Sequence, residues 1–394
     1  MAPKRGLQAA NTAAPAPGFG AEDYLPFARP SLDEQTIQSV VDVLRSGWIT
    51  TGPRTARFEG ALSQYFGGRV VKTFTSATAA LEVALLAAGI GPGDEVITSA
   101  MSFAATANVI LRVGAQPVFV DVELGSRNMD FDRIEAALTD RTRALMPVHF
   151  AGRPVDMDRL YEIAKRRGLR VIEDAAHAMG AKWGARRIGS FGDIVVFSFH
   201  PNKNMTTIEG GALVLDDPDE ARQVDLHRFH GIKRTPEGEI DIELAGTKSN
   251  FSDVSSAIGL AQLAQLESFN ARRRELAQLY FDRLQTDPPV QFPDRADDGH
   301  AWHIFTPLLP LERVGMRRSD FVRRMHERGI GVGVHYPSIP SLELYCKLGF
   351  SDEAYPNAAR IGRETVSLPL FPGMRDADID RVCSATREVL AEHR

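Results

Sequence analysis

Short apolar runs alternate with helical repeats along the first half of the chain. The runs have the length of buried strands, and the segments between them carry apolar residues at intervals of three or four. In one segment Met157, Leu160 and Ala164 share a helical face, with Asp156 as the expected N-cap and Gly168 as the expected stop. This alternation predicts an α/β fold in which helices cover both faces of a sheet. The predicted strands lie in residues 70–76, 91–99, 116–122, 143–150, 169–175, 194–199 and 210–215.

The pattern changes in the second half of the chain. Residues 232–250 are polar and predict a surface excursion, whereas residues 253–284 carry a long helical repeat expected to bridge two domains. Strands of a smaller α+β unit are predicted at residues 300–309, 329–336 and 366–372. The predicted divisions are a mobile tail at 1–24, a large domain at 25–265 and a small C-terminal domain at 266–394.

Composition narrows the class of protein. Of the 394 residues 43% are apolar and 25% are charged, as in ordinary globular enzymes, and the net charge of -5 argues against a nucleic-acid surface. With only Cys346 and Cys383 the chain has neither a disulfide framework nor a zinc or iron–sulfur motif, so no metal is expected. The N-terminus has no continuous apolar h-region, and no run approaches the roughly 18 residues of a membrane span. We expect a soluble, cytoplasmic protein.

Polar residues follow several of the predicted strands, where ligands bind in an open α/β sheet. Ser76, Ala77 and Thr78 stand where a strand turns into a helix, and their small side chains would let backbone N–H groups approach a phosphate. The alternative is a plain helix N-cap, which this motif alone favours.

The strand "VIED" ends in Glu173 and Asp174, followed by small residues and His177. A carboxylate at the rim of a buried strand needs a cation or hydrogen-bond donors, and the ring nitrogen of a bound pyridinium would serve. Asp174 could equally well cap the next helix instead of binding a ligand. Phe103 follows another strand; it fits the core better when taken alone, but it could lie flat on a planar ring.

The stretch "FSFHPNKNMTTIEGG" places Ser198 at a strand end and Lys203 five residues later, on a turn shaped by Pro201. Most lysines are solvated surface groups. Lys203 instead lies between two apolar runs, where a lowered pKa would make its amine a nucleophile that forms a Schiff base with a carbonyl carbon. A phosphate cradle, a ring-nitrogen carboxylate, an aromatic lid and this lysine are together the parts of a pyridoxal 5'-phosphate (PLP) site.

The motifs "GWITTGP", "TSATAAL", "PVHFAGRP", "VIEDAAHAMGA", "FSFHPNKNMTTIEGG" and "AIGLAQL" resemble the DegT/StrS sugar aminotransferases from about residue 25 onward. The resemblance implies a fold-type I PLP-dependent transferase, with a mostly parallel seven-stranded sheet and a smaller C-terminal α+β domain. Four segments, "FSFHPNKNMTTIEGG", "GTKSNFSD", "HAWHIF" and "SLPLFP", are similar to the branch of UDP-4-amino-4-deoxy-L-arabinose aminotransferase. That branch implies amino transfer from L-glutamate to a UDP-linked 4-keto sugar, for cell-surface polysaccharide, lipid A or antibiotic sugars.

The resemblance also implies roles for individual residues. Lys203 matches the lysine that binds the cofactor covalently, and Asp174 matches the aspartate at the pyridine nitrogen. The remaining implied cofactor contacts are Ala77, Thr78 and Ser198 at the phosphate, Phe103 on the ring and His177 near the 3-hydroxyl.

Family members are homodimers whose active sites borrow groups from the partner chain, which implies the same here. The borrowed segment reads G-x-N-Y-R in many members, and this chain has "GTKSN", with Lys248 in place of the Asn and Asn250 in place of the Arg. A lysine suits a dianionic phosphate, so Lys248 and Asn250 are candidate cofactor contacts. The arabinose branch also carries a Lys and an Asn at these two positions, but it has an aromatic residue between them where this chain has Ser249.

Substrate contacts are expected from Trp48 and Thr50 by family likeness and from His335 and Tyr336 in the C-terminal domain. Further histidines, His300 and His303 beside Trp302, either line the pocket or are structural residues whose hydrogen bonds are made within the protein.

Two other functions fit the family pattern less well. Deoxysugar dehydratases of the family have a histidine in place of the lysine or a cysteine-held iron–sulfur cluster, and Lys203 with two cysteines disfavours both types. A regulatory protein that binds the cofactor or a sugar nucleotide without turnover is the other alternative. The intact set of Lys203, Asp174 and Ser198 disfavours it.

Overall fold

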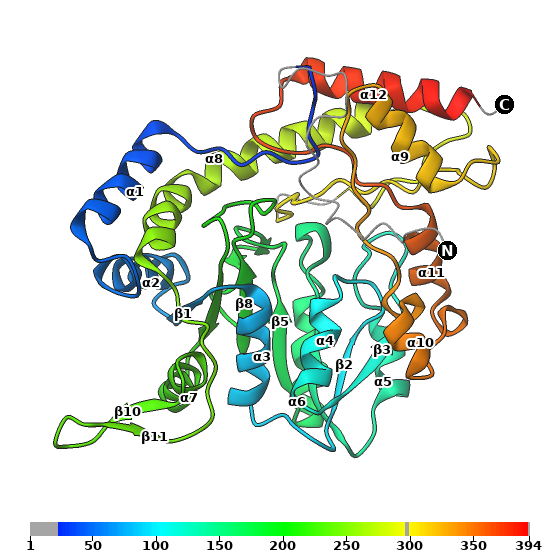
Figure 1. Ribbon diagram of the computed structural model, residues 1–394. Coiled ribbons are helices and arrows are strands. Elements are labelled where there is room, and N and C mark those ends of the chain that lie inside the picture. Colours follow the sequence, from blue (N-terminus) through cyan, green and yellow to red (C-terminus); the bar gives the residue numbers. More distant parts are fainter. Residues whose placement is uncertain (1–22, 296–298, 393–394) are drawn as a thin grey trace, which may run out of the picture.

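The computed structural model describes residues 23–295 and 299–392, and its centre is a seven-stranded sheet flanked by helices (Figure 1). The strand order is β1-β9-β8-β5-β4-β2-β3. The strands are β1 (Val70–Phe74), β2 (Glu95–Ser99), β3 (Gln116–Val120), β4 (Thr142–Met146), β5 (Arg170–Asp174), β8 (Ile194–Ser198) and β9 (Gly211–Leu215).

Only β9 runs against its neighbours in this sheet. It pairs antiparallel with both β1 and β8, and β8, β5, β4, β2 and β3 pair in parallel, so six strands share one direction. The predicted mostly parallel, seven-stranded sheet is confirmed. Two short hairpins accompany it: β6 (Lys182–Trp183) with β7 (Arg186–Arg187), and β10 (Ile232–Arg234) with β11 (Ile240–Ile242).

The sheet has a separate core on each face, because successive side chains of a strand point to opposite faces. Ile172 of β5 packs with helices α3, α4 and α7, and Val171 packs on the opposite face with α2, α5, α6 and α8. These helices are α2 (Pro53–Tyr65), α3 (Ala77–Ala87), α4 (Ala105–Arg112), α5 (Ile134–Ala137), α6 (Met157–Arg167), α7 (Pro218–Arg228) and α8 (Asp253–Arg283). Both faces are covered, as a parallel sheet requires.

The predicted ends of α6 are confirmed. The Asp156 side chain accepts a hydrogen bond from the Arg159 N–H, and Gly168 ends the helix at a φ of 65°, where glycine is favoured.

The long helix α8 joins two cores. Leu266 lies in the core beneath the sheet, whereas Leu276 and Tyr280 lie in a second core built largely from C-terminal residues. The predicted boundary at 265/266 falls inside this helix and stays a prediction. The remaining helices are α1 (Glu34–Ser46), α9 (Arg318–Glu327), α10 (Glu343–Lys347), α11 (Pro356–Glu364) and α12 (Asp376–Ala391).

The three C-terminal segments predicted as strands pair through single bridges rather than ladders. Phe305 bridges Leu368, and Gly333 bridges Ser367. Leu25 also bridges Ile330, so the first described residues pack against the C-terminal part. The predicted tail at 1–24 lies almost entirely outside the described residues. In the part of the chain that the structure describes, no helix is long and apolar enough to cross a membrane.

Asp253, the first residue of α8, ties that helix to α2. Its buried carboxylate accepts hydrogen bonds from the N–H groups of Gly52, Arg54 and Thr55 and from the Thr55 hydroxyl, at 2.7–3.0 Å. The capping position of α2 is Gly52, which has no side chain to accept these bonds. Asp253 therefore caps α2 from about 200 residues away.

Replacing Asp253 by Ala should lower the free energy of unfolding by about 3 kcal/mol, because several buried donors lose their acceptor at once. Urea denaturation of the purified protein measures this loss. Asp33, which caps α1 at the surface, is the matched control, and Asp33→Ala should cost less. Equal losses for the two variants would contradict the role given to Asp253.

Candidate active site

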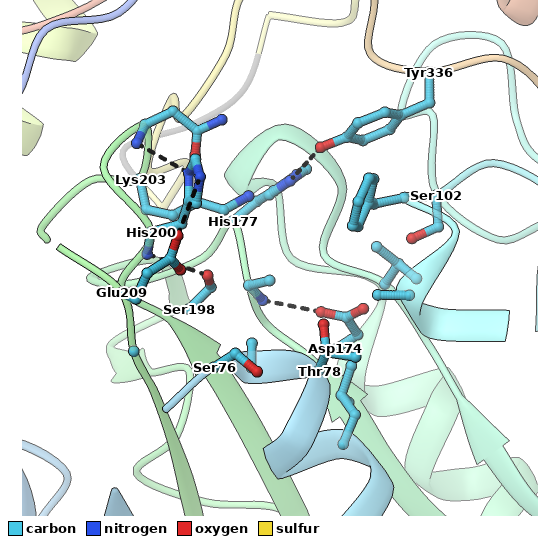
Figure 2. Close-up of a pocket in the computed structure, with 18 residues that line it drawn as sticks. Ser76, Thr78, Ser102, Asp174, His177, Ser198, His200, Lys203, Glu209 and Tyr336 are labelled. Atoms are coloured by element: carbon cyan, nitrogen blue, oxygen red, sulfur yellow. Dashed lines mark hydrogen bonds and ion pairs between the residues drawn. The ribbon is translucent and has the colours of Figure 1, made fainter. Parts of the chain in front are cut away.

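A cavity of about 180 Å³ opens at the edge of the sheet where the parallel strands end (Figure 2). The segments that follow β1, β2, β5 and β8 line it, together with the residues that precede the antiparallel strand β9. The structure brings together eight of the residues predicted from the sequence: Ala77, Thr78, Phe103, Asp174, His177, Ser198, Lys203 and Tyr336.

The N-terminus of α3 forms one wall of the cavity. Ser76 caps the helix by accepting from the Ala79 N–H, and the N–H groups of Ala77 and Thr78 have no acceptor within the helix. Gly211 lies against this turn, where an added Cβ would come within 2.6 Å of the Ala77 nitrogen. The missing side chain lets β9 approach the helix closely, and Ser198 adds a hydroxyl to the same wall. Free N–H groups at a helix start can bind an anion.

Asp174 lies at the end of β5 with its carboxylate in the cavity (Figure 2). One oxygen accepts from the Thr106 hydroxyl at 2.7 Å and the other from the Ala176 N–H at 3.1 Å. Thr106 is in turn hydrogen-bonded to the Ser102 hydroxyl at 2.7 Å. Burial raises the pKa of Asp174, while the two donors and the charge of Lys203 lower it. A cationic partner in the cavity would stabilise this carboxylate further.

Lys203 enters the cavity from the turn that follows β8. Its backbone N–H donates to the His200 carbonyl, which closes the turn. The side chain is half-buried, and burial lowers the pKa of its amine to about 7, against the opposing charge of Asp174. A substantial fraction of this amine is therefore uncharged near neutral pH.

His177 and Tyr336 face each other across the cavity, at 3.2 Å between Nε2 and the phenol oxygen (Figure 2). His177 Nδ1 accepts from the Ala151 N–H at 3.2 Å, so the ring proton lies on Nε2 and is directed at Tyr336. Burial lowers the pKa of His177 well below its usual value. Phe103 and Tyr336 lie 5.6 Å apart between ring centroids, and Phe103 is 58% exposed.

Other predicted residues lie outside the cavity lining. His335 is buried behind it, hydrogen-bonded to Ser367 and stacked on Phe27. The exposed residues in this group are Trp48, Thr50 and Lys248.

Lys248 and Asn250 belong to a segment that runs antiparallel beside β1. Asn250 bridges Phe74, the last residue of that strand. The Lys248 amine donates to Asn250, whose side-chain amide donates to Thr51 at 2.5 Å. Both residues lie at the surface of this chain.

Sequence reasoning missed Ser102 and Thr106, and used His200, Asn202 and Glu209 only as parts of a motif. Thr106 is the most informative omission, because its hydroxyl contacts a residue 68 positions away. The sequence does indicate that the buried carboxylate of Asp174 needs hydrogen-bond donors. It does not indicate which residue supplies them.

The sequence profile of the DegT/DnrJ/EryC1/StrS aminotransferase family matches residues 30–387 of this chain. The chain belongs to this family.

Relatives of known structure or function agree with this membership. SpsC of Bacillus subtilis, a spore coat polysaccharide biosynthesis protein, is 39% identical over 93% of this chain and 97% of its own. Spr1654 of Streptococcus pneumoniae, assigned as a sugar aminotransferase, is 32% identical with a TM-score of 0.87, over 94% of this chain and 100% of its own. It has been solved in its PLP and PMP forms. PseC of Helicobacter pylori, an aminotransferase of pseudoaminic acid biosynthesis, is 27% identical with a TM-score of 0.88, over the same shares.

The chain is a PLP-dependent sugar aminotransferase of this family, as predicted. Its cavity fits the cofactor in three respects. The free N–H groups at the start of α3 suit a phosphate, the buried carboxylate of Asp174 suits a protonated ring nitrogen, and the Lys203 amine suits an aldehyde.

Replacing Thr106 by Val removes a donor from Asp174 at constant side-chain volume, so the pKa of the carboxyl should rise further. A folded-state pKa above the unfolded value means that stability is lost as pH rises through that range. Thr106→Val should therefore cost about 1–2 kcal/mol at pH 8 and less in acid, where the carboxyl is protonated. Urea unfolding of the cofactor-free chain at the two pH values measures this. Thr106→Ser keeps the hydroxyl as the control, and an equal loss at both pH values would refute the explanation.

Proposed function

We propose that the enzyme transfers an amino group from L-glutamate to the C4 carbonyl of a UDP-linked 4-keto sugar, giving a 4-amino sugar nucleotide and 2-oxoglutarate. The observation that carries the proposal is the meeting of Lys203 and Asp174 in one cavity beside the free N-terminus of α3. The family and its sugar aminotransferases support the reaction class.

In this proposal three parts of the cavity hold the cofactor. The N–H groups of Ala77 and Thr78, with the Ser198 hydroxyl, would bind its phosphate, since all three residues line the cavity. The Asp174 carboxylate would accept a hydrogen bond from the protonated ring nitrogen and so keep that nitrogen protonated. The other proposed contacts are Phe103 against the ring face and His177 near the 3-hydroxyl. The bound cofactor supplies an electron sink for the carbon that loses its proton.

Lys203 then has two tasks. Its Nζ would hold the cofactor aldehyde at rest and, when free, would accept the proton from the α-carbon of the amino donor. In the second half-reaction the same Nζ gives a proton to C4 of the sugar. An amine with a pKa of about 7 is suited to both directions near neutral pH, because its charged and uncharged forms are both populated.

Resemblance to the arabinose branch supports the UDP-linked substrate. The segments that carry it are "FSFHPNKNMTTIEGG", "GTKSNFSD", "HAWHIF" and "SLPLFP". SpsC acts in polysaccharide biosynthesis and PseC in that of an acidic sugar, so a product destined for a cell-surface polysaccharide is consistent with both relatives.

A panel of UDP-, GDP- and dTDP-linked 4-amino sugars tests the proposal in the reverse half-reaction. The UDP-linked sugar should convert the cofactor to its aminated form at least about tenfold faster than the others. Glutamate should be the fastest of the common amino acids in the forward half. Lys203→Ala should convert none of them, whereas Lys165→Ala, an exposed lysine on α6, should match the wild type. A faster GDP- or dTDP-linked sugar would refute the UDP assignment.

We also propose a homodimer in which Lys248 or Asn250 of each chain contacts the cofactor phosphate of the other. Both residues lie at the surface, outside the cavity of their own chain, and the Asn250 amide donates to the exposed Thr51. Among the described residues, the cavity lining includes no arginine and only Lys203 among lysines, so a dianionic phosphate gains a cation if the partner supplies one.

Mixing two inactive variants tests this arrangement. Lys203→Ala and Lys248→Ala chains, unfolded together and refolded at equal amounts, should recover about a quarter of wild-type activity, since half of the random dimers hold one intact site of two. Each variant refolded alone gives the baseline. Recovery no greater than the mean of the two baselines would contradict a site shared through Lys248, and Asn250→Ala in the same scheme distinguishes the two residues.

A further inference from the structure

His303 lies against the Lys203 amine although it is absent from the cavity lining. Its Nε2 is 3.4 Å from Lys203 Nζ, and the ring is 1% exposed. The backbone N–H of His303 donates to the Ala151 carbonyl at 2.9 Å, and Arg273 donates to the His303 carbonyl at 3.0 Å. The main chain is thus fixed from two sides, which leaves the imidazole with the lysine as its hydrogen-bond partner.

The other ring nitrogen of His303 indicates where its proton lies. Nδ1 is buried and has no hydrogen-bond partner among the described residues. A buried N–H without an acceptor costs more than a lone pair without a donor, and orphaned buried N–H groups are rare in proteins. The proton is therefore favoured on Nε2, where it faces Lys203 Nζ.

The charges around His303 keep the ring neutral. Burial lowers its pKa well below the usual value, and the groups that add to this effect are Lys203, His177, Arg273 and His335. His177 is the nearest of the rings, at 4.4 Å between centroids, and its own proton is directed at Tyr336. A neutral imidazole with its proton on Nε2 can donate only to an uncharged amine, since an ammonium group has no lone pair.

We propose that His303 is the positioning residue of Lys203, donating Nε2–H to Nζ and so holding the amine uncharged and in place whenever it is not bound to the cofactor. The inference rests on the function proposed for Lys203. It adds that the lysine gains its reactivity from an imidazole of the C-terminal part of the chain as well as from burial.

The pKa of Lys203 tests this in the full-length holoenzyme in its pyridoxamine 5'-phosphate form, in which Nζ is free. Competitive labelling with acetic anhydride across pH, read from the Lys203 peptide by mass spectrometry, gives the midpoint. The wild-type midpoint should lie below that of an ordinary lysine in this form, and at about pH 7 in the cofactor-free chain. In His303→Asn, which cannot reach Nζ, it should rise by about one unit, whereas the amide of His303→Gln, which can, should restore it. An unchanged or lower midpoint in His303→Asn would overturn the proposal.

His300→Asn is the matched control, because His300 is also buried and near in sequence but stacks on Trp302. The Asn side chain can still accept from the backbone N–H of Trp302, as His300 Nδ1 does. The Lys203 midpoint should therefore not move. Repeating the labelling on the cofactor-free full chain separates this inference from the proposed function, since the midpoint does not depend on turnover.

Nitrogen NMR of the wild type labelled at histidine provides a second measurement that needs no variant. It distinguishes the two ring tautomers, and His303 should carry its proton on Nε2. A proton on Nδ1 would overturn the proposal even if every variant failed to fold.

Discussion

The burial of an amine and a carboxylate in one cavity is the constraint on which the rest of the site depends. Burial moves Lys203 and Asp174 toward their neutral forms, and each charge opposes the shift of the other. The site keeps both groups reactive by surrounding them with hydrogen-bonding groups instead of counter-ions. The sheet makes this possible, because the ends of its parallel strands and the start of antiparallel β9 open on the same edge.

A close backbone contact brings the C-terminal part of the chain to this edge. The N–H groups of Ala301 and His303 donate to the carbonyls of Gly152 and Ala151, each at 2.9 Å. A Cβ on Gly152 would lie 2.8 Å from the His177 carbonyl and 3.1 Å from the Ala301 side chain. The glycine of the "HFAG" motif therefore lets two distant segments touch, and the same contact sets His303 beside the lysine.

The sequence predicted those parts of the fold and site whose signals are local. Lys203, Asp174 and Ser198 follow or end apolar runs, and the ends of an open sheet are where ligands bind. Thr106, His303 and Asp253 act through partners 68 to about 200 residues away, which no local pattern specifies. The C-terminal apolar runs predicted as strands pair with each other only at single bridges. An alternation of apolar and polar residues indicates that one side of a segment is buried, but it does not show that a neighbouring strand is present.

The cavity fits the cofactor better than it fits the phosphates of the proposed nucleotide-linked substrate. The cavity is lined by the Lys203 amine, the carboxylates of Asp174 and Glu209 and neutral hydrogen-bonding groups, and among the described residues its lining contains no arginine. A helix N-terminus, with about half a positive charge, is the main compensation that one chain offers there to a phosphate dianion. A nucleotide-linked sugar would bring two further phosphates, so cations for its recognition must lie beyond this lining. The reacting centre can then stay constant while the residues that select the nucleotide vary.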